Sequence, residues 1–146
     1  MFIWFGWRVW TPNAGRAMCR ARRLDRKDLV ILNNVSAEFA VSPDSRPLAD
    51  RARSAVFSSI RDAVLVSGTI TGESAQMVDP ENVKKTLPDT PVLDNSGVKH
   101  GTVEDVLKIA DGCVVGSSLK VDGHTWNAVD PKRAREFMDI VRKMRG

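Results

Sequence analysis

The chain has 146 residues, 42% of them hydrophobic, which is the size of one ordinary domain with a packed core and excludes a disordered or fibrous protein. Its net charge of +4 is uneven, because residues 1–27 carry a net +6 and the remaining residues a net −2. The basic character therefore belongs to an N-terminal segment, and we predict no nucleic-acid partner.

The opening residues 1–14 are unusually aromatic, with Trp4, Trp7 and Trp10 in the sequence MFIWFGWRVW. This run is far shorter than the ~20 residues of a membrane-spanning helix, and its charges follow the apolar residues instead of preceding them as in a signal peptide. Two interpretations stay open. Together with Arg8 and Arg16, the tryptophans make an interfacial anchor for peripheral membrane contact, or they pack onto the remaining domain, residues 15–146.

Only two cysteines are present, Cys19 and Cys113, and they are too few and too far apart for a disulfide framework. The two histidines, His100 and His124, both fall in expected loops, so we predict no metal site and no cofactor. A reducing, cytoplasmic location fits this cysteine usage.

From residue 15 onward, an Arg-rich helical stretch is followed by alternating strands and helices. The expected strands are 28–33, 63–67, 91–94 and 112–115. The expected helices are 15–26, 47–60, 79–87, 102–110 and one that opens at Asp130-Pro131. Strict alternation in units of about thirty residues predicts an α/β fold with a parallel sheet and right-handed crossovers.

The spacing of apolar residues predicts which helix faces are buried. Thr102, with Asp105 three residues later, predicts a helix cap of the capping-box kind. The β-branched run 112–115 predicts a strand covered on both faces. The residues expected to face inward are Leu48, Ala52, Ala55, Val56, Ile60, Val103, Val106, Leu107, Ala110, Ala134, Phe137, Met138 and Val141.

Polar, glycine-containing loops follow every expected strand, and in a parallel sheet these loops gather at one edge. Short Gly/Ser clusters are common turns, so one such loop is weak evidence. Two in successive loops, Ser96-Gly97 and Gly116-Ser117, favour phosphate or a small phosphorylated ligand held by backbone N–H groups. Further candidate ligand-site residues are Asn34, Ser67, Gly68, Thr71 and Lys120, although a surface role is the default for the lysine.

Asp94 ends a strand beside these loops. We expect it to point into the same site, where it would act as a general acid/base or hold a ligand hydroxyl. The alternative is that it caps the free N–H groups of the loop that follows. Trp126 is expected to fold over the last loop as an apolar cover.

Several segments resemble the BtpA/SgcQ family, whose cyanobacterial members are called photosystem I biogenesis proteins. The resemblance covers roughly residues 28–142 and is carried by VLVSGTITG, PVLDNSGV and above all ADGCVVGSSLKVDGHTWNAVDPKRAREFM. It implies the C-terminal half, (βα)4, of a TIM-type (β/α)8 barrel of the ribulose-phosphate-binding kind. It implies no known reaction.

Two functions from different classes remain open. One is an enzyme-like barrel for a small phosphorylated metabolite, with Asp94 or Glu38 in proton transfer. The other is a non-catalytic assembly or stability factor for a membrane complex such as photosystem I.

A half barrel would leave two strand edges unpaired and an apolar face bare. The residues on that face are Val30, Leu32, Val64, Val66, Leu93 and Val115, or their alternates one position away. We therefore expect either a fragment that folds poorly or a homo-oligomer that completes the barrel.

Overall fold

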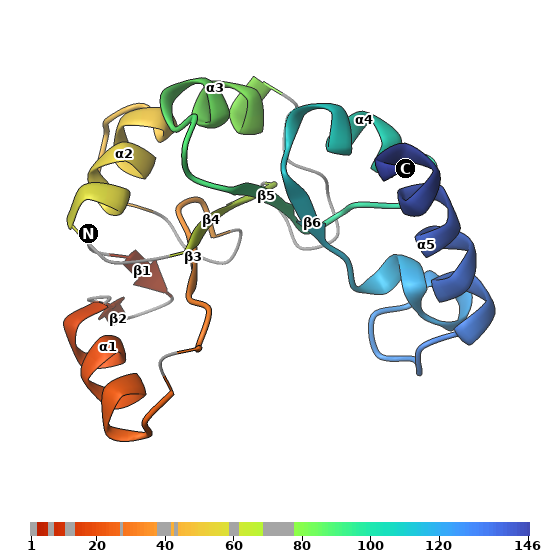
Figure 1. The fold of residues 1–146 in the computed structure, drawn as a ribbon, viewed down its shortest axis with the longest axis horizontal. Coiled ribbons are helices and arrows are strands. Elements are labelled where there is room, and N and C mark those ends of the chain that lie inside the picture. Colours follow the sequence, from red (N-terminus) through yellow and green to blue (C-terminus); the bar gives the residue numbers. More distant parts are fainter. Residues whose placement is uncertain are drawn as a thin grey trace.

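A computed structural model describes residues 3–5, 8–10, 14–26, 28–37, 42, 44–58, 62–68 and 78–146. Its main body is an arc of four strands with helices along the outer side (Figure 1). The strands are β3 (Leu32–Asn34), β4 (Ala63–Ser67), β5 (Val92–Asn95) and β6 (Gly112–Val114). The helices of the body are α2 (Leu48–Ser58), α3 (Val78–Thr86), α4 (Val103–Ile109) and α5 (Pro131–Arg145).

The four strands pair in chain order, and every pairing is parallel. This confirms the expected α/β alternation, and together with the structural similarity reported below it makes this body the (βα)4 half of a TIM-type barrel. The strand expected from residue 28 begins only at Leu32, because Ala63, the first residue of β4, stands opposite Leu32. Before that point Ile31 is held by Asp62, whose N–H donates to the Ile31 carbonyl and whose carboxylate accepts from the Ile31 N–H.

Side-chain alternation divides the sheet into a helix-facing side and an open side. Val66, Asp94 and Cys113 share one register row. Because Val66 packs with α2 and α3, this row faces the helices. Leu65, Leu93 and Gly112 share the neighbouring row, which faces the other way. The open side is the concave side of the arc in Figure 1.

The core forms two clusters, both between the sheet and the helices. The first joins β3, β4 and β5 to α2 and α3, and the second joins β6 to α4 and α5. The expected inward residues of α2 and α4 lie in these clusters, except that Ile60 is outside the described residues. In α5, Phe137 is buried as expected, whereas Met138 is exposed because the apolar stripe continues through Ile140 and Val141 instead.

The second cluster leaves β6 half covered, so the expectation of a strand buried on both faces is wrong. Cys113 packs toward α4 and α5, but Val114 is 40% exposed on the open side. The apolar run 112–115 cannot distinguish these cases, because its composition is the same whether one face or both are covered.

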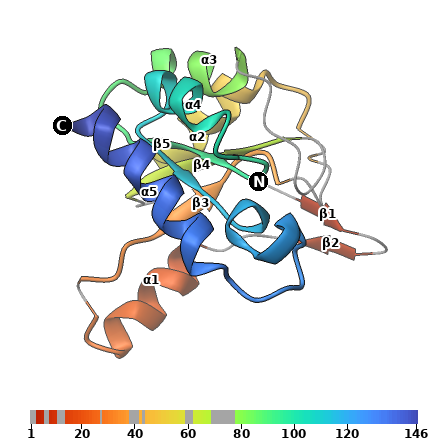
Figure 2. The same cartoon turned by 90° about the vertical axis from the view of Figure 1, so that its right-hand side faces the viewer.

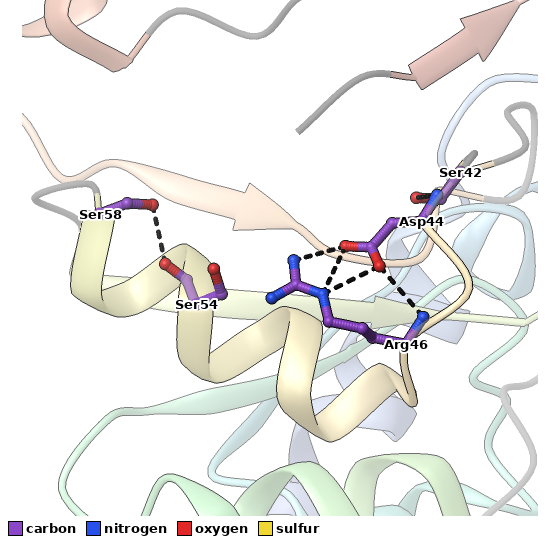
Figure 3. A network of polar contacts seen from close by, with 5 residues as sticks. All are labelled: Ser42, Asp44, Arg46, Ser54 and Ser58. Atoms are coloured by element: carbon purple, nitrogen blue, oxygen red, sulfur yellow. Dashed lines mark hydrogen bonds and ion pairs between the residues drawn. The ribbon is translucent and has the colours of Figure 1, made fainter.

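The start of α2 is held by a local polar network (Figure 3). Arg46 donates from Nε and Nη2 to the carboxylate of Asp44, and its backbone N–H donates to Asp44 Oδ1. These bonds lower the pKa of Asp44 to about 2. The Asp44 N–H in turn donates to Ser42 Oγ, and near the other end of α2 the hydroxyl of Ser58 donates to the carbonyl of Ser54.

Of the two helix starts predicted from the sequence, the one at α5 forms as expected and the capping box at α4 does not. Asp130 caps α5 as expected, since its Oδ1 accepts from the N–H groups of Lys132 and Arg133. Thr102 precedes α4 but makes no capping bond. Its hydroxyl accepts from the Lys99 N–H of the preceding turn, and Asp105 pairs with Lys108, so the capping box does not form.

The N-terminal part comprises an antiparallel hairpin, β1 (Ile3–Phe5) with β2 (Arg8–Trp10), and the helix α1 (Ala14–Arg23). Figure 2 shows α1 on the opposite side of the sheet from α2, α3 and α4. The side chains of Arg20, Arg22 and Arg23 at its end are exposed, as expected of a solvated basic helix. No helix of the described residues is long and apolar enough to cross a membrane.

The cap of α5 gives a stability prediction. Asp130→Ala should lower the free energy of unfolding by about 1 kcal/mol, because two N–H groups of the first turn lose their acceptor. Asp139→Ala is the control, since it removes an exposed ion pair with Arg142 worth less than about 0.5 kcal/mol. Urea unfolding measures both, and equal losses would contradict the capping role.

Candidate anion site at the ends of β5 and β6

A cavity of about 250 Å³ lies at the C-terminal ends of β5 and β6. The loop after β5 and the loop after β6 form its walls. It contains both predicted Gly/Ser turns, so residues about twenty positions apart in the sequence meet at one place. The lining residues are Asn95, Ser96, Gly97, Val98, Lys99, Val114, Val115, Gly116, Ser117, Ser118, Lys120 and Thr125.

The cavity has the chemistry of an anion site. Its described lining holds two lysines, Lys99 and Lys120, and no carboxylate. Hydroxyl groups supply further donors, and Ser117 Oγ lies 2.8 Å from Thr125 Oγ1 across the loop that follows β6. In this setting a phosphate would meet positive charge without a competing negative side chain.

Backbone conformation also marks the two turns. Ser96 and Gly97 both have a left-handed backbone, with φ of 79° and 73°. Serine adopts this conformation rarely, and such residues concentrate at functional sites. Gly116 has open space where a Cβ would stand, with no atom within 4 Å. The cavity wall is therefore shaped by a bare backbone at this position.

A second polar group lies beside the cavity at the ends of β3, β4 and β5. Asn34 and Asn95 each donate an amide hydrogen to Ser67 Oγ, both at 2.8 Å. The hydroxyl of Ser36 bonds to the backbone of Ser67, and the N–H of Ser36 donates to Asn34 Oδ1. Asn95 belongs to both this cluster and the cavity lining, so it connects them.

Asp94 does not line the cavity. Its register partners Val66 and Cys113 place it on the helix-facing side, and it is 1% exposed. Neither carboxylate oxygen makes a hydrogen bond within the described residues. Burial raises the pKa of Asp94 to about 6. The expected orientation into the site is therefore wrong, and a role in proton transfer stays a prediction.

His100 connects the cavity wall at Ser118 to α5. Its Nδ1 lies 3.0 Å from Ser118 Oγ, and its Nε2 lies 2.8 Å from the carbonyl of Arg133. Because a carbonyl only accepts, Nε2 carries a proton. The Nε group of Arg133 donates to the carbonyl of Ser118, and Phe137 packs edge-on against the imidazole. These contacts fix the short helical turn Ser117–Leu119.

Of the remaining predicted residues that the structure describes, Gly68 and Trp126 do not line the cavity. Gly68 is buried directly after β4, and Glu38 and Thr71 lie outside the described residues. Trp126 does not cover the loop, since it is 88% exposed. No group of three or more His, Cys, Asp or Glu side chains among the described residues is placed to hold a metal ion.

Sequence reasoning missed Asn95, Lys99 and Thr125 as separate site residues. Asn95 was within reach of the sequence, because Val92 must face the core and Asn95 is three positions later, on the opposite face. The other two follow from how the two loops fold against each other, which no periodicity in the chain records.

Comparison with known families places these residues in context. The model of the BtpA family matches residues 5–143. The chain belongs to the BtpA family. The match begins well before residue 28, where the resemblance of the individual motifs starts.

Two relatives illustrate the range of the family. The sgc region protein SgcQ of Escherichia coli K12 is 38% identical over 137 residues, covering 94% of this chain and 51% of SgcQ. The photosystem I biogenesis protein BtpA of Synechocystis is 28% identical over 124 residues, covering 85% of this chain and 43% of BtpA. The chain thus spans about half the length of these curated relatives.

Among solved structures, N-(5'-phosphoribosyl)anthranilate isomerase from Pyrococcus furiosus is similar in fold, with a TM-score of 0.59 and 19% identity. The similarity covers 89% of this chain and 56% of the isomerase. It supports the barrel-type fold and, at this identity, nothing further about chemistry.

The buried carboxyl gives a pH prediction. The pKa of Asp94 is raised from 3.8 to about 6 by burial, so the folded chain holds this proton more tightly than the unfolded chain. The free energy of unfolding should therefore decrease as the pH rises from about 4 to about 6, by about 3 kcal/mol, and stay level above that. Asp94→Asn should lack this decrease and be the more stable protein at pH 7.5.

Urea unfolding at pH 4.5, 6 and 7.5 measures the effect. Asp89→Asn is the matched control, because Asp89 is an exposed carboxyl just before β5. If the free energies of unfolding of the Asp94→Asn variant and of the unaltered chain change with pH in the same way, ionisation of Asp94 does not destabilise the folded chain.

Proposed function

We propose that the cavity at the ends of β5 and β6 binds phosphate or the phosphate group of a small metabolite. One observation carries the proposal: two Gly/Ser turns and two lysines surround a single cavity whose described lining contains no carboxylate. The position also fits, since parallel α/β barrels bind ligands at the C-terminal ends of their strands.

The neighbouring amide and hydroxyl cluster suits the uncharged part of such a ligand. Asn34, Ser36 and Ser67 lie at the ends of the preceding strands, and Asn95 joins them to the cavity. Amide and hydroxyl groups both donate and accept, so they match a ligand hydroxyl or carbonyl. We therefore assign phosphate to the cavity and the polar remainder of the ligand to this cluster.

No catalytic step is assigned. Asp94 is buried away from the cavity, and Glu38 lies outside the described residues. Binding can be tested without knowing a reaction.

Gly116→Val should abolish phosphate binding. A Cβ at Gly116 meets no protein atom within 4 Å, so the added side chain occupies the space beside the cavity without disturbing the core. Lys120→Ala should weaken binding about tenfold, as expected for loss of one charge-assisted hydrogen bond. Titration with inorganic phosphate, followed by calorimetry and amide NMR, measures both effects.

Gly101→Val is the matched control. Gly101 also has open space where a Cβ would stand, but it does not line the cavity. Equal binding by the two valine variants, or phosphate-induced shifts confined to the Arg-rich segment before residue 27, would refute the site.

A second candidate function comes from one relative. BtpA of Synechocystis is named a photosystem I biogenesis protein, and this chain is 28% identical to it. On this proposal the chain is a non-catalytic assembly or stability factor for a membrane complex. The exposed arginines of α1 and the tryptophans before it would supply the contact surface.

Membrane contact has a direct assay. The full chain should float with anionic liposomes and be released by salt, because attraction between surface charges is screened over a Debye length of ~8–10 Å. A chain lacking residues 1–14 should not float. Neutral liposomes provide the control, and equal flotation of the full and shortened chains would remove the anchor.

A further inference from the structure

The four-stranded sheet has two unpaired edges. Among the described residues, no strand pairs with the outer edge of β3 or of β6. Parallel sheets are normally covered on both faces, and an unpaired edge offers N–H and carbonyl groups to another strand. Here the helices that pack on the sheet, α2 to α5, cover one side, and the other side is concave (Figure 1).

Apolar side chains are exposed on this open side and at both edges. Val30 is 64% and Leu32 is 42% exposed at the β3 edge, and Val114 is 40% exposed at the β6 edge. Leu65 and Leu93 on the middle strands are half-buried. Val64, Val66 and Val115 pack under the helices, so at these places the open side presents the expected alternates one position away, Leu65 and Val114.

Strand counting restricts what can cover this face. A closed parallel barrel has eight strands, and two copies of this sheet supply that number. A two-fold axis along the barrel would pair β6 of each copy with β3 of the other, and all strands would remain parallel. Both edges would then be satisfied by the same contact made twice, as in an isologous dimer.

The register of that contact follows from barrel geometry. The strands of a barrel all tilt in one sense. A path that follows the hydrogen bonds around the whole barrel therefore returns to its starting strand about eight residues earlier in the sequence. Halfway around the barrel, the offset is about four residues. Within one copy the row runs from Asn34 through Leu65 and Leu93 to Gly112 without a shift. Four residues before Asn34 is Val30, so Gly112 would face the second copy's Val30 and Val114 its Leu32.

We propose that two copies of this chain associate through β3 and β6 to form one closed barrel, with Val114 of each copy packed against Leu32 of the other. The exposed apolar residues of the two edges meet in this arrangement. Val114 also lines the cavity, so the second copy's β3 would extend the cavity wall. The inference rests on the fold and not on phosphate binding, so either can fail alone.

Light scattering during size-exclusion chromatography of the full chain tests the association. We expect a species of twice 16.1 kDa. Val114→Lys should shift the dimer midpoint concentration upward at least a hundredfold, since a charge would be buried at the apolar contact. Phe57→Lys is the control, because Phe57 is exposed on the outer helix α2 and should leave the dimer unchanged.

Disulfide trapping tests the geometry without placing a charge at the contact. Leu32→Cys and Val114→Cys are made separately with Cys19 and Cys113 replaced by Ser, and the two proteins are mixed. Only the mixture should form a disulfide-linked dimer, and Phe57→Cys mixed with Val114→Cys should not. A cooperatively folded 16.1 kDa monomer, undefined aggregates, or equal trapping in all mixtures would overturn the proposal.

Discussion

The pairing of β4 with β5 decides how the rest of the molecule is arranged. Val66 stands opposite Asp94, and Ser67 stands opposite Asn95. Because neighbouring positions on a strand face opposite ways, this register sends one pair under the helices and the other to the open side. A slip of one residue would bring Asp94 to the ligand edge and bury Asn95, so the same register places both the core and the candidate site.

The sequence predicts much of this body because its signals are local. The strand 63–67 has the expected bounds, and Asp130-Pro131 begins a helix as its chemistry requires. The Gly/Ser turns also meet at one cavity, as expected from parallel strands. In each case the deciding interaction lies within a few residues of the pattern, or follows from the parallel sheet alone.

Predictions that depend on distant partners fare worse. Asp94 lies near the end of a strand, but the direction of its side chain depends on which residues of that strand pack under the helices. Thr102 and Asp105 have capping-box spacing, yet a turn at Lys99 and an ion pair with Lys108 take both side chains. Trp126 is apolar enough to cover a loop, but the loop closes through Ser117 and Thr125 instead. Composition does not encode such competition between partners.

The contacts of His100 link three regions that are far apart in the sequence. The imidazole bridges the Ser118 hydroxyl and the Arg133 carbonyl, while the Arg133 side chain returns to the Ser118 carbonyl. Two of these bonds end on backbone carbonyls, which any residue at that position supplies, and only the contact between His100 and Ser118 joins two side chains. Evolutionary change at positions 100 and 118 is therefore coupled: within the family, a replacement of the histidine should accompany a replacement of Ser118, which lines the cavity, whereas position 133 can change without them.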